Sequence, residues 1–125
     1  RGRQELRGRA LSFRYAFEGW WYALRTQRNT WIHAAVSGVV FALAFWLGIS
    51  RLEWSVLILT TTLVWMAEFA NTSLEAVVDL VSPDYHPLAK AAKDVAAAAV
   101  LVGALGAVIV GLLILGPPLW QRLFS

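Results

Sequence analysis

The stretch EFANTSLEAVVD, from Glu68 to Asp79, places several polar side chains in a segment that is otherwise apolar. A helix turns by 100° per residue, so the four most polar positions share an arc of roughly 80° on one helix face. The stretch therefore predicts a polar stripe along one side of a helix. The stripe consists of Glu68, Asn71, Glu75 and Asp79.

The composition of the chain indicates that this helix crosses a membrane. The 125 residues are 58% hydrophobic and 15% charged, with a mean hydropathy of +0.58, which is far more apolar than a soluble domain of this size. Two uncharged intervals, 29–50 and 95–121, each exceed the ~20 residues that a helix needs to span a bilayer core. A third apolar segment begins at Trp54, and its uncharged part ends at Ala67. This segment therefore spans the bilayer only if it continues through the stripe.

The N-terminal segment has the pattern of a basic amphipathic helix on a membrane surface, with aromatic residues on one face and seven arginines before the first span. A soluble helix packed on a partner protein is the alternative. We assign the arginines to anionic lipid and expect no nucleic-acid partner. The predicted fold is an all-α integral membrane protein in a single domain over 1–125. Its parts are a surface helix over 1–28, spans over 30–49, 54–80 and 90–115, and a loop over 81–89.

Basic residues predict the orientation. They are concentrated before the first span and after the second, so we expect the N-terminus and the loop from Ser82 to Lys93 to be cytoplasmic. The sequence SPDYHP places the loop because Pro83 and Pro87 interrupt the helical pattern. We expect GPP, at 116–118, to end the last helix on the opposite side.

The depth of the stripe gives it a functional meaning. If the apolar core starts near Trp54 and takes ~20 residues, Glu68 lies about 8 Å inside the cytoplasmic boundary. Glu75 and Asp79 then lie at the boundary or beyond it. A carboxylate at the depth of Glu68 costs roughly 2.5 kcal/mol or more unless it faces water, a cation or a partner, which makes it a candidate functional group.

Cationic side chains after the loop, such as Lys90 and Lys93, reach the same level. Carboxylates hold Mg²⁺, Mg²⁺ and Lys hold a polyphosphate, and a further carboxylate accepts a proton from an alcohol, so these residues suit phosphoryl transfer to a lipid. Two alternatives stay open. A non-catalytic scaffold would use the charges as salt bridges between helices, for example Lys93 to Glu75. A small transporter or proton relay would place its carboxylate near the membrane midplane.

At these residues the chain also resembles a known family. AEFANTSLEAVVD followed by VSPDYHPLAKAAKDVAAAAVLV resembles the prokaryotic diacylglycerol kinases, and SPDYHPLAKAAKDVAA is most similar to their undecaprenol kinase branch. The resemblance covers about residues 12 to 112. It implies a homotrimer in the bacterial inner membrane, with active sites shared between subunits on the cytoplasmic side. It also implies ATP with Mg²⁺ as donor and a membrane lipid alcohol as acceptor, with undecaprenol preferred and diacylglycerol as the alternative.

The resemblance also implies roles for individual residues. Glu68 matches the catalytic base, and Glu75 and Gln27 match the metal ligands. These roles agree with the expected depths in the membrane. Glu68 is the deepest carboxylate, so desolvation makes it the better base, while Glu75 near the interface meets a hydrated metal. The positions that match nucleotide contacts are Tyr15, Glu68, Asn71, Asp79, Asp84, Tyr85, His86, Lys93 and Asp94.

The segment QRNTWIH departs from the family pattern Glu-x-Asn-x-Arg-Ile-His. Gln27 replaces the Glu, and Trp31 replaces the Arg. Gln offers one carbonyl oxygen and no charge, so we expect either weaker metal binding or a contribution from another group. His33 is either a metal ligand or a hydrogen-bonded packing residue. Trp65, the one tryptophan away from the predicted interfaces, is a candidate for lining the route by which the lipid reaches the site.

Overall fold

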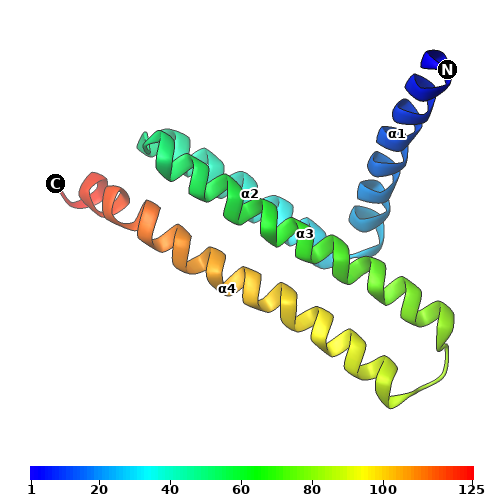
Figure 1. Ribbon diagram of the computed structural model, residues 1–125. Coiled ribbons are helices and arrows are strands. Elements are labelled where there is room, and N and C mark those ends of the chain that lie inside the picture. The colour runs from blue at the N-terminus through cyan, green and yellow to red at the C-terminus, as the bar shows by residue number, and fades with distance from the viewer.

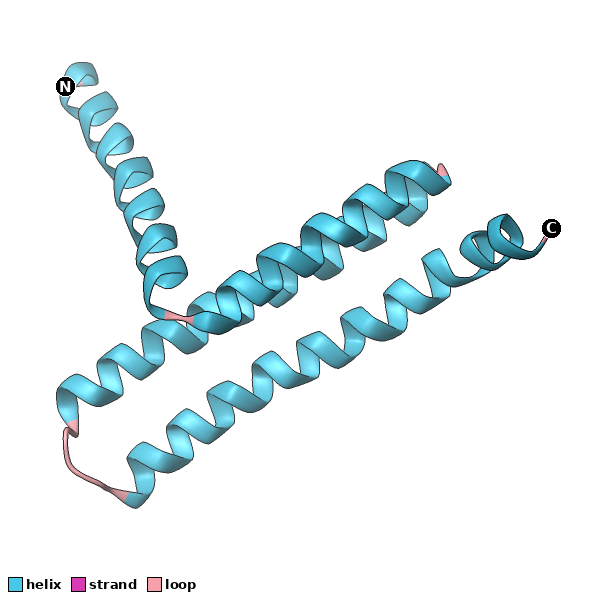
Figure 2. Cartoon of the chain, turned by 180° about the vertical axis from the view of Figure 1, so that it is seen from behind, coloured by secondary structure: helices cyan, strands magenta, loops and turns pink.

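The computed structural model describes all 125 residues and consists of four helices, α1 (Gly2–Thr26), α2 (Arg28–Leu47), α3 (Arg51–Val81) and α4 (Pro87–Phe124). Helices α2, α3 and α4 lie side by side, while α1 leaves the bundle at a steep angle (Figures 1 and 2). The three bundled helices are long and apolar enough to cross a membrane. The all-helical class, with an N-terminal helix followed by three candidate spans, is therefore confirmed.

Helix α3 runs without interruption through the polar stripe, as predicted. Its 31 residues extend over about 46 Å at ~1.5 Å per residue, so it exceeds a hydrocarbon core of ~30 Å. The helix begins at a capping box in which the Ser50 hydroxyl accepts from the Glu53 N–H and the Glu53 carboxylate accepts from the Ser50 N–H, both at 3.1 Å. Just before it, Gly48 ends α2 in the left-handed conformation, with φ of 65°.

Helix α4 corrects one expectation, because GPP does not end it. Pro117 and Pro118 lie inside the helix, which continues to Phe124. Proline removes a backbone donor and crowds the preceding turn, so it bends a helix as readily as it stops one, and the last turns of α4 deviate from its axis (Figure 1). Contacts hold this end in place: the Arg122 guanidinium lies 4.6 Å from the centre of the Trp46 ring on α2.

The apolar core is concentrated at the end of the bundle that holds the α2–α3 turn. Ala44, Leu57, Ile114 and Leu115 form the buried cluster there. Along the α3–α4 contact, a Cβ atom built on Gly103 would lie 3.8 Å from Val64, which is ordinary packing distance. Only 10 of 125 residues are buried, so the bundled helices direct most of their apolar surface outward, as expected of helices that lipid or other protein covers.

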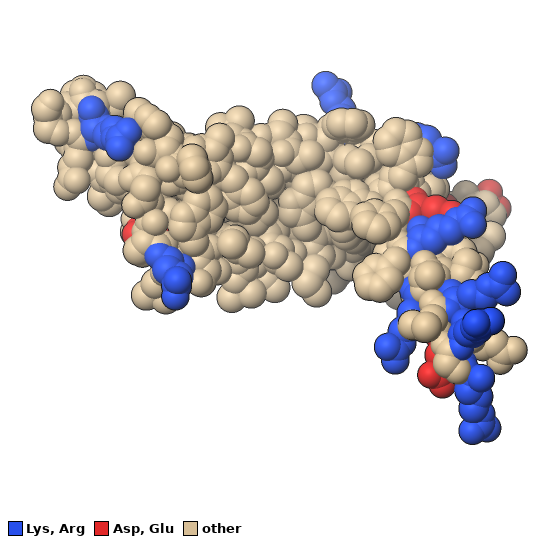
Figure 3. Space-filling model, turned by 90° about the horizontal axis from the view of Figure 1, so that it is seen from above, with Lys and Arg blue, Asp and Glu red and all other residues tan.

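The charged residues are concentrated at the opposite end. Figure 3 shows lysines, arginines and carboxylates gathered where α1 leaves the bundle, a wide charge-free surface along the helices, and a few charges at the far end. This distribution matches a bilayer-spanning bundle with one strongly basic side. The α3–α4 loop, whose residues carry much of the predicted site, lies at the basic end (Figure 1).

Candidate active site at the polar end of the bundle

Glu68 is the most deeply buried charged residue of the chain, with 1% of its surface exposed. Neither of its carboxylate oxygens has a hydrogen-bond partner. The Nε2 atom of His33 lies 3.4 Å from Oε2, within ion-pairing range but without the alignment of a hydrogen bond. Asn71, also buried, has an unpaired side-chain carbonyl oxygen. Buried polar atoms without partners are costly, so Glu68 and Asn71 retain the capacity to accept hydrogen bonds from a further group.

Glu75 lies seven residues further along α3 and contacts the break between α1 and α2. The Gln27 amide Nε2 donates to the Glu75 carboxylate over 3.3 Å. Gln27 has an extended backbone between the two helices, with φ of −118° and ψ of 115°, which directs its side chain across to α3. The two residues predicted to bind metal are therefore neighbours.

The donor set suits a hydrated metal. The chain brings together no group of three His, Cys, Asp or Glu side chains that could hold a metal ion. Mg²⁺, however, usually keeps several waters and binds through one or two carboxylates together with substrate phosphates. One carboxylate, from Glu75, and one amide oxygen, from Gln27, fit such a site.

A cleft of about 260 Å³ lies at the α3–α4 loop. Lys93 forms an ion pair with Asp79 across it, and Lys90 pairs with Asp94 along α4 at 2.6 Å. The possible Lys93–Glu75 bridge is not the pair that forms. Six of the predicted nucleotide contacts line the cleft, namely Asp79, Asp84, Tyr85, His86, Lys93 and Asp94.

Hydrogen bonds between side chains and the backbone hold the loop in shape. The Nδ1 atom of His86 accepts from the Leu88 N–H at 3.1 Å and so caps α4, and the Ser82 hydroxyl donates to the Asp84 carbonyl at 2.9 Å. His86 therefore has a structural task in addition to the nucleotide contact predicted for it. Tyr15 is different, because it lies on α1 with 63% of its surface exposed and does not line the cleft.

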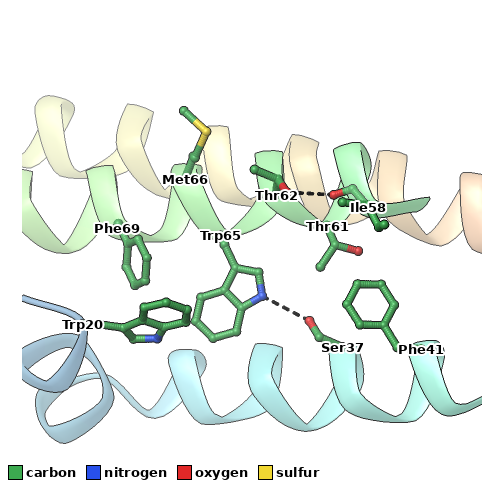
Figure 4. Close-up of a pocket in the computed structure, with 9 residues that line it drawn as sticks. All are labelled: Trp20, Ser37, Phe41, Ile58, Thr61, Thr62, Trp65, Met66 and Phe69. Atoms are coloured by element: carbon green, nitrogen blue, oxygen red, sulfur yellow. Dashed lines mark hydrogen bonds between the residues drawn. The ribbon is translucent and has the colours of Figure 1, made fainter. Parts of the chain in front are cut away.

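An apolar cavity of about 370 Å³ lies between α1, α2 and α3. Figure 4 shows the Trp65 ring between α2 and α3, with Trp20 beside it and Phe69 one turn further along α3. The Trp65 indole N–H donates to the Ser37 hydroxyl at 3.1 Å, and its ring centre is 5.7 Å from that of Trp20. Trp65 therefore lines a cavity, and its place on a lipid route stays a prediction. Ser37, the hydrogen-bond partner of Trp65, was not predicted from the sequence, although it lies one helical turn after His33 and therefore on the same face of α2.

The chain is similar in sequence to known membrane lipid kinases. Residues 14–115 match the family described as prokaryotic diacylglycerol kinase. A diacylglycerol kinase of Synechocystis is 51% identical over 110 residues, covering 87% of this chain and 63% of that protein. The undecaprenol kinase of Bacillus subtilis is 43% identical, covering 94% of this chain and 95% of that protein. The diacylglycerol kinase of Escherichia coli is 37% identical, covering 70% of this chain and 78% of that protein.

The chain thus spans a little under two thirds of the Synechocystis relative and nearly all of the Bacillus one. The matched region begins within α1 and extends close to the prolines of α4, so it includes the buried carboxylate, the Gln27–Glu75 pair and the cleft. The chain belongs to the prokaryotic diacylglycerol kinase family, a family of membrane lipid kinases.

Proposed function

We propose that this protein is an ATP-dependent lipid kinase that transfers the γ-phosphoryl group to the hydroxyl of undecaprenol. The observation that carries the proposal is the buried, unpartnered carboxylate of Glu68. It lies on the same helix as Asp79, which lines the charged cleft together with Lys93. A base inside the apolar layer and cations outside it suit an acceptor that is anchored in the membrane and a donor that arrives from water.

In the proposed reaction, Glu68 takes the proton of the lipid hydroxyl. The hydroxyl oxygen then forms a bond to the γ-phosphorus of ATP, while the bond from that phosphorus to the bridging oxygen breaks and its electron pair leaves on ADP. Lys93 neutralises negative charge on the transferring group. Glu75 and Gln27 would hold Mg²⁺, which screens the phosphate charges when bound.

The remaining predicted residues surround the nucleotide in this proposal. Asn71 and Asp79 continue the polar stripe from Glu68 outward. Asp84, Tyr85 and His86 come from the loop, Asp94 from α4, and Tyr15 from the surface helix α1. The expected orientation, with this end of the bundle on the cytoplasmic side of the inner membrane, brings the cleft to the compartment that holds ATP.

The acceptor has two candidates. The segment SPDYHPLAKAAKDVAA and the Bacillus relative, which matches along nearly its whole length, favour undecaprenol. The Synechocystis relative, with 51% identity, favours diacylglycerol. Both lipids present a primary hydroxyl near the interface, so the catalytic residues are compatible with either.

A homotrimer with shared sites accompanies this proposal. One protomer leaves most of its apolar helix surface uncovered and lacks a three-residue metal cluster. A neighbouring copy would cover part of that surface and add groups around Glu68.

The test is ATP-dependent phosphate transfer by the purified protein in mixed micelles with Mg²⁺, with undecaprenol and diacylglycerol compared at equal mole fraction. We expect transfer to undecaprenol at the higher rate, and none by Glu68→Gln even though it assembles normally. Preference for diacylglycerol would change the acceptor but keep the enzyme class. Full activity of Glu68→Gln would remove Glu68 from its role, and the absence of transfer to either lipid by the intact protein would favour the scaffold.

A further inference from the structure

His33 is the only ionisable side chain between Arg28 and Arg51, a stretch of otherwise uncharged residues that forms α2 and the turn after it. It faces α3, and 18% of its side-chain surface is exposed. The ionisable group within ion-pairing distance of it is Glu68, with Nε2 3.4 Å from Oε2. The chain therefore places the one ionisable ring of this span beside its one buried carboxylate.

The depths of the two residues agree by independent counts. His33 follows Arg28, the charged start of α2, by five residues, which is about 8 Å along the helix axis at ~1.5 Å per residue. Glu68 lies about 8 Å inside the same boundary when counted from the other end of α3. The pair thus forms at one level, inside the apolar layer.

The imidazole is held by its neighbours. The Trp65 ring centre lies 6.5 Å from that of His33, with the ring planes inclined at 57°. Trp65 is in turn fixed by its hydrogen bond to Ser37, one turn along α2 from His33. His33 and Ser37, on one face of α2, thus both lie beside the Trp65 indole, which occupies one side of the imidazole.

A packing role alone does not account for this arrangement. A leucine or phenylalanine would fill the same space, but the buried carboxylate would then have no donor within reach from its own protomer, at considerable cost. His33 provides a donor that is 3.4 Å away, about 0.5 Å more than an aligned N–H···O bond requires. Catalytic hydrogen bonds are often long before substrate binds and shorten in the complex.

We propose that His33 is the positioning residue of Glu68: its Nε2–H donates to Oε2 and leaves Oε1 to receive the proton of the lipid hydroxyl. This assignment rests on the proposed kinase function. His33 does not touch the acceptor and exchanges no proton with it. It fixes which carboxylate oxygen faces the substrate.

The test exploits the geometry of the ring. The amide nitrogen of glutamine reaches the position of Nε2 in histidine, whereas the amide nitrogen of asparagine reaches only that of Nδ1. His33→Gln therefore keeps the donor to Glu68, and His33→Asn removes it with a side chain of similar polarity. The two variants form a matched pair, with His33→Leu as the apolar reference.

Turnover would be measured in mixed micelles with ATP, Mg²⁺ and undecaprenol, together with the KM for ATP and the elution volume of each variant. We expect His33→Gln to keep kcat within about threefold of the unsubstituted protein. We expect His33→Asn and His33→Leu to lose about tenfold to a hundredfold in kcat, as for a misplaced catalytic group, with an unchanged KM for ATP.

A positioning role predicts different kcat values for His33→Gln and His33→Asn, whereas a packing role does not. The inference is therefore overturned if His33→Asn has the kcat of the unsubstituted protein, or if the kcat of His33→Gln falls as far as that of His33→Leu. An unchanged elution volume excludes misfolding as the cause of a loss. Failure of the kinase proposal is a distinct result, because the unsubstituted protein would then transfer no phosphate to either lipid.

Discussion

Lys93 on α4 and Asp79 on α3 form an ion pair that joins the two helices on either side of the Ser82–His86 loop. Both side chains are partly open to water and line the cleft. An exposed pair contributes little to folding stability. The pair therefore keeps an ammonium group at the level where the phosphates are proposed to bind, instead of letting it extend into solvent.

Replacing Lys93 by methionine keeps the length of the side chain and removes its charge. We expect kcat/KM for ATP to fall by about a hundredfold, the usual size for loss of one group that stabilises transition-state charge, with little change in melting temperature. Steady-state kinetics and thermal unfolding in the same micelles measure both. Arg51→Met, at the opposite end of α3, is the control for loss of a positive charge and should leave kcat/KM unaltered.

Gln27→Glu restores the carboxylate that the family pattern has beside Glu75. With 3.3 Å between the Gln27 nitrogen and the Glu75 oxygen, two carboxylates here would repel each other without metal and share a cation with it. We expect the Mg²⁺ concentration for half-maximal activity to fall by about tenfold, and the melting temperature to drop in the presence of chelator. Gln27→Ala serves as the reference. An unaltered Mg²⁺ requirement in Gln27→Glu would argue against a metal at this position.

Glu68→Gln should make the protein inactive but more stable. The substitution removes a buried charge that has beside it only the unaligned His33 Nε2, at 3.4 Å, so we expect the free energy of unfolding to rise by about 1 to 3 kcal/mol. Thermal melting in detergent, compared with Glu5→Gln on the exposed start of α1, measures the gain. A lower melting temperature for Glu68→Gln would mean that the ionised carboxylate is already satisfied within the assembly.

Ser50→Ala should have the opposite effect to Glu68→Gln, with lower stability and unchanged activity. It breaks the capping box at the start of α3, and we expect a loss of about 1 kcal/mol in stability with kcat intact. Ser55→Ala is the matched control, because the Ser55 hydroxyl donates to the Arg51 carbonyl of its own helix and caps nothing. Equal melting temperatures for the two variants would contradict the prediction.

Much of the architecture follows from residue order. The helical periodicity of the sequence and the spacing of its charges were sufficient to predict one continuous helix through Glu68 and Asp79. The prolines at 83 and 87 located the loop. All of these are local properties of the chain. The end of α4 was predicted wrongly. Pro117 and Pro118 remove backbone donors there. The stacking of Arg122 on Trp46, however, joins residues that are 76 positions apart (122 − 46), which no local rule includes.

The candidate site was likewise predicted only in the part that depends on local spacing. Angular spacing predicted that the stripe residues share a face, but it says nothing about how α4 is rotated against α3. That rotation decides that Lys93 meets Asp79 and not Glu75. Nor could spacing along α2 reveal that His33 faces Glu68. The proposed role of Tyr15 came only from the family resemblance.

The core cluster of Ala44, Leu57, Ile114 and Leu115 lies at the end of the bundle away from the cleft. Along α3, the chain therefore separates Leu57 of this cluster from Glu68 by about 16 Å at ~1.5 Å per residue, roughly half of a ~30 Å hydrocarbon core, and from the cleft by more. Protein engineers can use this division: substitutions that improve packing around Leu57 would make the protein more robust for purification, while the substrate preference could be altered independently at the other end.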